Sequence, residues 1–479
     1  MKFEDIKNIP NMDGVFMSKL RGQFSPEQLG ARLFMEREDL PTEENILVWF
    51  HERFHYLQIV FTPYGQLKWG AYRSVVSDVV ESWIGLSKLN AIQKKIPIAE
   101  YLKDGTKAGL QVATNTWMNT APYEIYSLVE HGLNTNIVQL FPALRNEDGC
   151  PLIRVQGEDY SLRGIDILES FAKFEEAMLG ELITGKTLDE YINPQKLNPE
   201  YFIALYYFIE EVGADRLVEF PVICELALSV SNIPAPYSLE CFRENAPNWR
   251  FVELIKAIKD GSTLPPVDIY SNSSFYAYAN EVLNRCNYPL LEQIWQSCIE
   301  YVNAANLTMA EEMKAAIDYK QTHPWALSYP MRDYEEFTSD DFSRFEPLFT
   351  IVEDGVLYNF DHIDQNELLL ELHLQALVKQ ISGQLSRYCI YTDVLMCGYS
   401  YFGNATCPHY LSGECDGYIC AESNLLDFKL DGSGNLIHGC SFELILNIIG
   451  TSVRDIYVGD IGKSVDLNQL SAAAKNLSN

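Results

Sequence analysis

Apolar residues recur at three- and four-residue intervals over much of the chain up to about residue 325. This spacing places them on one face of a helix, so it predicts helices that bury that face. Thr42 can cap the first of these helices, with Glu43 and Glu44 next to the positive end of its dipole. The segments in which the spacing is clearest, and over which we predict helices, are 42–61, 74–89, 165–181, 199–220 and 309–320.

Fewer segments show the patterns that are typical of strands. Apolar and polar residues alternate over 30–38, as in a half-buried strand. Two apolar runs, 346–352 and 356–360, flank an Asp-Gly dipeptide, and this dipeptide between apolar runs is a strong signal for a β-hairpin. The pattern as a whole therefore predicts a mainly helical protein with a few strands.

The character of the sequence changes near residue 330. Helical spacing dominates before that point, whereas the predicted hairpin, a long amphipathic helix over 366–385 and a cysteine-rich stretch follow it. The length of 479 residues also exceeds that of most single domains. We therefore expect a mainly helical region over 1–330 and a mixed α/β region over 331–479.

Charge and composition restrict the partners and the compartment. The 36 Lys and Arg residues against 66 Asp and Glu residues give a net charge of −30, which repels phosphate backbones and anionic lipid surfaces. The first ten residues contain acidic side chains in place of the apolar core of a signal peptide, and the longest apolar stretch, 201–209, is too short to cross a bilayer. We expect a soluble, cytoplasmic protein that binds neither nucleic acid nor membrane.

An H-E-x-x-H motif, formed by His51, Glu52 and His55, lies inside the first predicted helix. Residues four apart lie one turn apart on the same face, so both imidazoles can bind one metal ion. Two neutral histidines suit zinc and leave room for a third protein ligand and a water, whose pKa the metal lowers to about 7. Glu52 would then accept the proton of that water. Trp49, Phe50 and Phe54 make the helix largely apolar around the motif, as a buried metal site requires.

On these residues the chain resembles the zincin metallopeptidases, and the resemblance covers the motif helix. It departs from the metzincin branch, which has a glycine and a histidine where this chain has Gln58 and Phe61. The gluzincin branch instead takes a glutamate from a later helix. The resemblance implies Zn²⁺ as cofactor, a polypeptide substrate, and a mainly α fold with a small mixed β-sheet (α+β) beside the motif helix.

Our choice for the third metal ligand is Glu169, in the predicted helix 165–181. It is an acid among apolar, core-facing residues, and a buried carboxylate is costly unless it pairs with a charge or a metal. Glu176, two turns further on the same face, is the alternative ligand, or it orients a histidine by a hydrogen bond without binding the metal itself. Gln58, one turn after His55, is expected to support the site in the same indirect way. The next choices for a ligand are Glu210 and Glu211, and His131 is a possible donor to the oxyanion of the reaction.

A second cluster of metal-ligating residues lies near the C-terminus. The eleven cysteines are an odd number without an export signal, which favours thiols or metal ligands over disulfides. A closed zinc site, core thiols and a redox or iron–sulfur role all remain open for this cluster, because it lacks paired C-x-x-C motifs. Its candidate ligands are Cys407, Cys415, Cys420 and Cys440, with His409 and His438 nearby.

The preferred function is therefore a zinc-dependent metallopeptidase with Glu52 as general base. One alternative is a binding or regulatory protein without catalytic activity, in which the metal is structural. The other is a non-haem iron protein, because two histidines and a carboxylate also suit iron.

Overall fold

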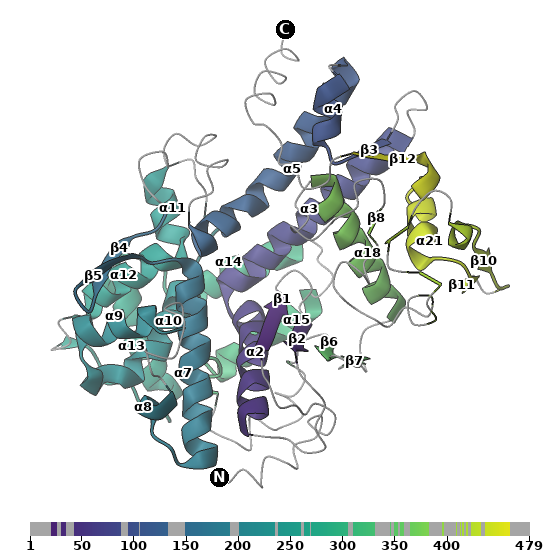
Figure 1. The fold of residues 1–479 in the computed structure, drawn as a ribbon. Coiled ribbons are helices and arrows are strands. Elements are labelled where there is room, and N and C mark those ends of the chain that lie inside the picture. Colours follow the sequence, from purple (N-terminus) through teal and green to yellow (C-terminus); the bar gives the residue numbers. More distant parts are fainter. Residues whose placement is uncertain are drawn as a thin grey trace. The chain divides into compact units, whose positions relative to one another are not determined.

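The structure is a computed structural model (Figure 1). The described residues are 21–25, 30–34, 43–87, 94–104, 106–132, 149–191, 201–234, 238–259, 263–268, 270–304, 310–330, 345, 349–352, 355–358, 365–382, 395–396, 409, 412, 414–415, 418–419, 423–432 and 436–459.

The chain divides into two compact units that are discontinuous in sequence. Unit 1 comprises Met1–Ala71, Tyr123–Glu353 and Leu357–Asn359, and unit 2 comprises the rest. The sequence analysis expects one boundary near residue 330, whereas residues 72–122 here group with the C-terminal part. Residues 331–344 lie outside the described part of the chain, so a boundary at that point stays a prediction.

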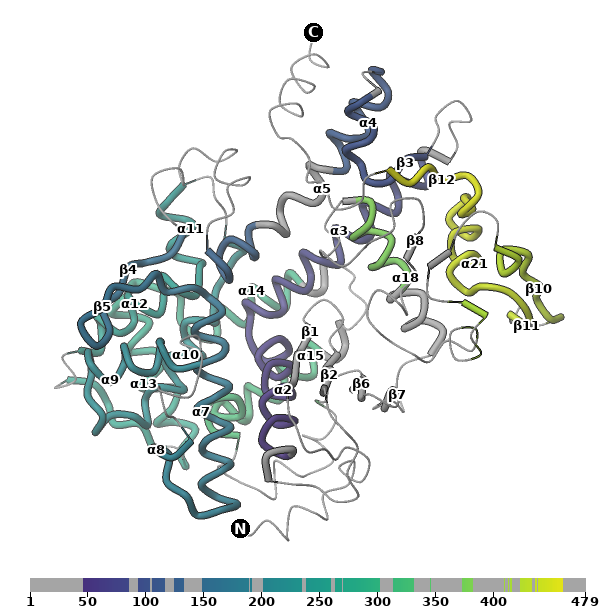
Figure 2. Tube along the Cα trace, in the orientation of Figure 1, coloured from purple at the N-terminus to yellow at the C-terminus, as the bar shows by residue number. Residues whose placement is uncertain are grey.

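Two packed helices, α2 (Glu43–Phe61) and α7 (Gly164–Thr184), form the centre of unit 1 (Figure 2). Both confirm predicted helices, at 42–61 and 165–181. The start of α7 is fixed by Asp166, which accepts hydrogen bonds from the backbone and side chain of Arg163, and its end by Gly185 in the left-handed conformation (φ +74°). The rings of Phe54 and Phe171 meet edge to face between the two helices, with centroids 4.8 Å apart.

Further helices pack around α7 in unit 1. The prediction of a single helix over 199–220 is wrong, because Gly213 (φ +115°) ends α9 (Ile203–Val212) and a 3₁₀ turn, η3 (Ala214–Glu219), precedes α10 (Phe220–Leu228). The predicted helix 309–320 is confirmed as α15. Among the described residues, the other helices that lie wholly within this unit are α8 (Leu188–Tyr191), α11 (Leu239–Asn245), α12 (Pro247–Ile258), α13 (Asn272–Arg285), α14 (Leu291–Ala304) and α15 (Ala310–Thr322).

A small mixed sheet has the strand order β1-β2-β6-β7, and its strands β1 and β2 contact α2. The strand β2 (Gly30–Phe34) pairs antiparallel with β1 (Arg21–Ser25) and parallel with β6 (Phe349–Val352). The strands β6 and β7 (Gly355–Tyr358) are neighbours, as the predicted hairpin requires. The described residues are therefore mostly helical with a small mixed sheet, as the sequence predicts.

One hairpin in unit 1 was not predicted from the sequence. It consists of β4 (Leu152–Val155) and β5 (Glu158–Ser161), joined by Gln156 and Gly157, which both have positive φ (+53° and +84°). Two such residues form the tight turn that matches the twist of a hairpin. The hairpin leads directly into α7, and Asn248 holds its base by donating to the carbonyls of Gly149 and Leu162.

Unit 2 combines parts of two long helices with the C-terminal elements. The helices α3 (Pro63–Ser87) and α5 (Lys107–His131) each contribute to both units. The helix α3 covers most of the predicted helix 74–89, and α18 confirms the predicted helix 366–385. The other elements that the structure describes in unit 2 are β3 (Lys94–Ile96), α4 (Ala99–Asp104), α18 (Gln365–Ser382), β8 (Leu395–Met396), β9 (Tyr418–Ile419), η5 (Asn424–Leu426), β10 (Lys429–Leu430), β11 (Leu436–His438), α21 (Ser441–Ile448), η6 (Val453–Asp455) and β12 (Ile456–Val458).

The core of unit 2 joins segments that are far apart in sequence. The strands β3 and β12 pair in parallel, and the backbone N–H of Ile98 donates to the carbonyl of Ile381 at 2.8 Å. Ile98, Tyr101 and Ala113 form a buried apolar cluster. His373 on α18 is fully buried, and its Nε2 lies 3.0 Å from the Ser441 hydroxyl.

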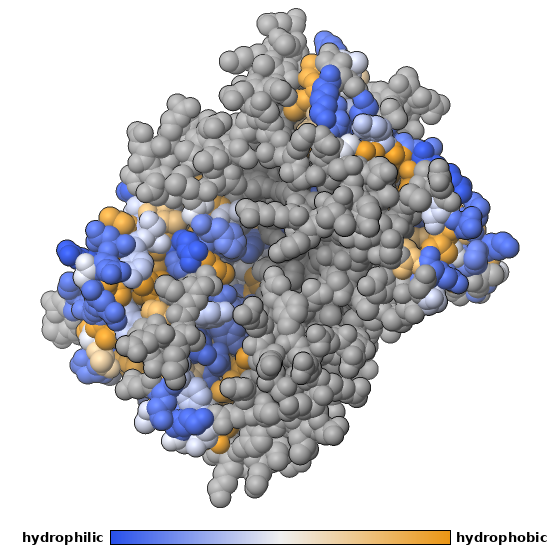
Figure 3. Space-filling view, in the orientation of Figure 1, coloured by the Kyte–Doolittle hydropathy of each residue, from blue (hydrophilic) through white to orange (hydrophobic). Residues whose placement is uncertain are grey.

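Hydrophilic and hydrophobic residues are interspersed over the described surface of unit 1 that faces the viewer in Figure 3. Among the described residues, no helix combines the length and the apolar character that a membrane crossing requires.

Candidate metal centre

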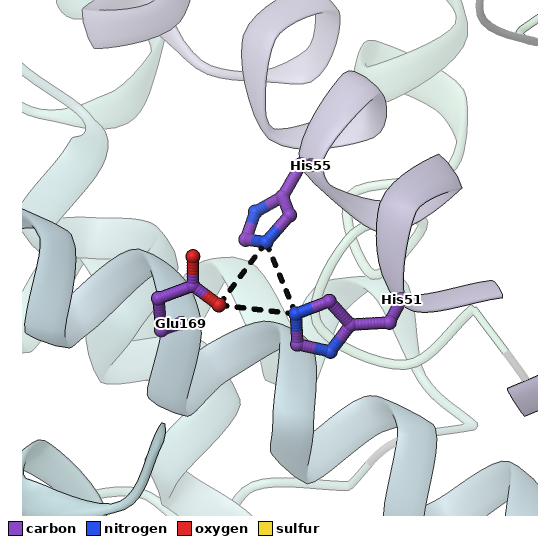
Figure 4. Close-up of side chains that lie close together, drawn as sticks. All are labelled: His51, His55 and Glu169. Atoms are coloured by element: carbon purple, nitrogen blue, oxygen red, sulfur yellow. Dashed lines mark hydrogen bonds and ion pairs between the residues drawn. The ribbon is translucent and has the colours of Figure 1, made fainter. Parts of the chain in front are cut away.

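The side chains of His51 and His55 on α2 and Glu169 on α7 point toward one another (Figure 4). The two histidines are one helical turn apart, and α7 packs against that face of α2. Within the described part of the chain, this trio is the one group of His, Cys, Asp or Glu side chains whose ligand atoms all lie within 4.8 Å of one another. The structure therefore brings together the three residues that the sequence analysis selected as metal ligands.

The distances among the three ligand atoms suit a shared metal ion. His51 Nε2 lies 3.0 Å from Glu169 Oε2, His55 Nε2 lies 3.3 Å from the same oxygen, and the two Nε2 atoms are 3.1 Å apart. Ligands bonded to zinc at roughly 2.0–2.1 Å with tetrahedral angles are separated by about 3.3 Å. The donor atoms thus form nearly the triangle that one face of a zinc site needs.

The other ring nitrogen of each histidine has its own partner. His51 Nδ1 lies 3.0 Å from Glu176 Oε2, and His55 Nδ1 lies 2.8 Å from Gln58 Oε1. Both partner atoms are acceptors, so both Nδ1 atoms donate a proton. In neutral imidazoles the Nε2 atoms then carry lone pairs, and these face Glu169. Metal-binding histidines usually have such a partner, which accepts a hydrogen bond from the ring nitrogen that does not bind the metal and so fixes the tautomer.

The site favours positive charge at the point where the ligand atoms meet. Burial lowers the pKa of His51, but hydrogen bonds to Glu169 and Glu176 outweigh this effect and raise that pKa to about 10. Burial raises the pKa of Glu169, but the charge of His55 and hydrogen bonds from both histidines hold that pKa well below its usual range. Two imidazolium rings with facing nitrogens would repel each other. A single divalent cation satisfies the same negative groups without this repulsion, so the residues present fit a metal.

Glu52 is not one of the three ligands, but it lies close enough to interact electrostatically with His51, His55 and Glu169. Its side chain is buried, with 5% of the residue exposed. Burial raises its pKa, and the charges of His51 and His55 counteract that effect only in part. A raised pKa makes the Glu52 carboxylate a stronger base than an exposed glutamate, which suits it to accept a proton.

Lys173 and Tyr201 are neighbours of the site that the sequence analysis missed. Lys173 Nζ donates to Glu176 Oε1 at 2.5 Å, so it occupies the carboxylate oxygen that does not face His51. The spacing of three residues between Lys173 and Glu176 on one helix was a visible signal for this pair. The Tyr201 ring meets the His51 ring at an angle of 63° with centroids 5.8 Å apart, and no local pattern indicates this contact.

The structure assigns other partners to the remaining candidate ligands. Glu210 accepts a hydrogen bond from the backbone N–H of Gln156, and Glu211 pairs with Lys259 at 2.7 Å. Both acids therefore serve structural contacts, and neither belongs to the ligand trio. His131 is exposed at the C-terminal end of α5.

The C-terminal cysteine cluster stays a prediction. Cys407 and Cys420 lie outside the described residues, while Cys415 and Cys440 lie within them. His409 uses both ring nitrogens: Nδ1 is 2.7 Å from Glu414 Oε2, and Nε2 is 2.9 Å from the carbonyl of Gly439. These contacts hold the loop around Cys440 without involving a thiol.

Comparison of the chain with protein-family models, with curated proteins and with solved structures found no match. The functional argument therefore rests on the geometry and chemistry of the site itself.

Proposed function

We propose that the chain is a zinc-dependent metallopeptidase with a zincin-like core, in which His51, His55 and Glu169 hold the metal. The observation that carries this proposal is the convergence of two Nε2 atoms and one carboxylate oxygen at 3.0–3.3 Å, next to Glu52 on the same helix as the histidines. The contacts of Glu176 and Gln58 with the two Nδ1 atoms support it further, because both Nε2 atoms are then the ones that point toward Glu169.

A zinc ion held by these residues would polarise a substrate carbonyl and lower the pKa of a coordinated water to about 7. Glu52 accepts the proton of the attacking water and donates it to the amine nitrogen that leaves. The raised pKa of Glu52 makes its carboxylate a stronger base, which favours the first of these transfers. We propose a polypeptide substrate, and the net charge of −30 favours basic segments of such a substrate.

The donor set also supports a second candidate, a mononuclear iron protein, because two histidines and one carboxylate are a common ligand set for non-haem iron(II). A third candidate, a binding protein with a structural metal, needs the same ligands but does not need Glu52 as a general base. The identity of the metal and the effect of changing Glu52 distinguish these three functions.

The experiment combines elemental analysis with a cleavage assay on protein purified without a histidine tag. We expect one zinc per chain in the wild type, its loss in His51→Ala, and its retention in Glu52→Gln. With an unmodified peptide library and mass spectrometry of new termini, Glu52→Gln should lower the cleavage rate by roughly 10²–10⁴-fold, the usual contribution of a general base.

Iron in place of zinc would support the second candidate. Cleavage by Glu52→Gln at the wild-type rate would contradict the proposed mechanism. Zinc retention with no cleavage of any peptide by the wild type would leave the binding protein as the better proposal.

A further inference from the structure

Gln58 on α2 uses both ends of its side-chain amide. Its Nε2 donates to the carbonyl oxygen of Leu168 at 2.9 Å, and its Oε1 lies 2.8 Å from His55 Nδ1. Only 2% of the residue is exposed. One buried amide therefore connects a candidate ligand on α2 with the backbone of α7, at the residue that precedes Glu169.

The carbonyl of Leu168 decides which way this amide faces. A backbone carbonyl only accepts hydrogen bonds, so the NH₂ group of Gln58 must face it. The reversed amide would place two oxygens against each other and leave buried donors and acceptors unsatisfied, which is costly. In the favoured orientation Oε1 faces His55, and the proton of a neutral His55 ring must then sit on Nδ1.

We propose that Gln58 is a positioning residue that sets the tautomer and the ring orientation of His55. The hydrogen bond to the Leu168 carbonyl holds the Gln58 amide in the orientation that this role requires. Because Leu168 and Glu169 are adjacent on α7, the hydrogen bond from Gln58 to Leu168 also keeps the Nε2 lone pair of His55 pointed toward the Glu169 carboxylate. The inference rests on metal binding at this site, as in the proposed function, but not on the reaction that follows.

This role differs from that of an ordinary buried glutamine. Gln66, at the start of α3, provides the comparison within the same unit: it is also fully buried, donates to the carbonyl of Val60 at 2.6 Å and accepts from Cys298 at 3.0 Å. Gln66 also donates to the carbonyl of Met313 at 3.4 Å, so replacing Gln66 by leucine removes at least as many buried hydrogen bonds as replacing Gln58 does. Only the replacement of Gln58 also removes the acceptor that faces Nδ1 of the candidate ligand His55.

The first test measures zinc affinity by competition with a chromophoric chelator in wild type, Gln58→Leu and Gln66→Leu. We expect Gln58→Leu to weaken zinc binding by about 10–100-fold, the usual effect of removing an outer partner of a metal ligand. Gln66→Leu should bind zinc as the wild type does. Equal affinities in the wild type and Gln58→Leu would overturn the inference while leaving the zinc site in place. A wild type that binds no divalent metal would overturn both this inference and the proposed function.

The second test needs no substitution and so does not depend on the variant folding. Long-range ¹H–¹⁵N correlation spectra of the zinc-loaded wild type, labelled in its 8 histidines, report the tautomer of each ring. We expect His55 to show a protonated Nδ1 and a metal-bound Nε2. Zinc on Nδ1 of His55, or an unprotonated Nδ1, would overturn the inference.

Discussion

His51 and His55 have outer partners of different charge. His51 Nδ1 contacts the carboxylate of Glu176, which Lys173 partly neutralises, whereas His55 Nδ1 contacts the neutral amide of Gln58. A carboxylate partner makes an imidazole a stronger electron donor than an amide partner does. We therefore expect His51 to contribute more than His55 to metal affinity through its outer contact.

Glu176→Gln should weaken zinc binding by about 10–100-fold. The new amide can still accept from His51 Nδ1, but the negative charge is lost and Lys173 becomes an uncompensated cation near the metal. Chelator competition measures the loss. Adding Lys173→Met should recover part of the affinity, because it removes that cation. A double variant that binds zinc more weakly than Glu176→Gln alone would contradict this account of the pair.

The ligands could be predicted from local sequence because each stands out in its own helix. His51 and His55 are four residues apart, and Glu169 is an acid on an apolar face. The contacts behind them could not be predicted in the same way. The hydrogen bond to Leu168 uses a backbone carbonyl, which every residue type has, and Tyr201 and His51 are far apart in sequence and meet only in the folded chain.

At the scale of elements, the candidate site lies between two helices that contribute different ligands. The helix α2 supplies both imidazoles, and α7 supplies Glu169, Glu176 and the Leu168 carbonyl. A metal ion bound to both helices adds a link that the unfolded chain lacks. Metal binding should therefore stabilise the folded state of unit 1.

We expect zinc at 100 times its dissociation constant to raise the free energy of unfolding by about 2.7 kcal/mol. Thermal unfolding with zinc and with a chelator measures this effect as a shift in Tm. His51→Ala is the control, since it removes a ligand and should unfold at the same temperature under both conditions. A zinc-dependent shift of equal size in His51→Ala would place the stabilising metal elsewhere, for instance at the C-terminal cysteines.

The elements themselves were predictable where one periodicity continues without interruption. The helices α2 and α7 begin and end within a few residues of their predicted bounds. The predicted helix 199–220 failed at Gly213, where the apolar spacing continues on both sides but the backbone turns to positive φ. The β4–β5 hairpin escaped prediction because its turn, Gln156–Gly157, lacks the Asn-Gly or Asp-Gly pair that usually marks one.

At the scale of the whole molecule, a buried histidine makes the stability of unit 2 depend on pH. In unit 2, burial lowers the pKa of His373 to about 3, from an ordinary value of 6.5. Below pH 6.5 the unfolded chain binds a proton that the folded chain excludes until about pH 3. The stability that comes from keeping His373 neutral is therefore complete above pH 6.5 and is lost as the pH falls toward 3.

His373→Gln removes this dependence, because glutamine does not titrate and can still bond to Ser441. Between pH 6 and pH 4, the wild type should lose up to about 1.4 kcal/mol of unfolding free energy per pH unit relative to this variant. Urea titrations followed by circular dichroism measure the difference, and the acidic groups common to both proteins cancel in it. His438→Gln, which changes an exposed histidine of the same unit, should keep the wild-type slope. Parallel stability curves for the wild type and His373→Gln would mean that His373 gains access to water before the unit unfolds.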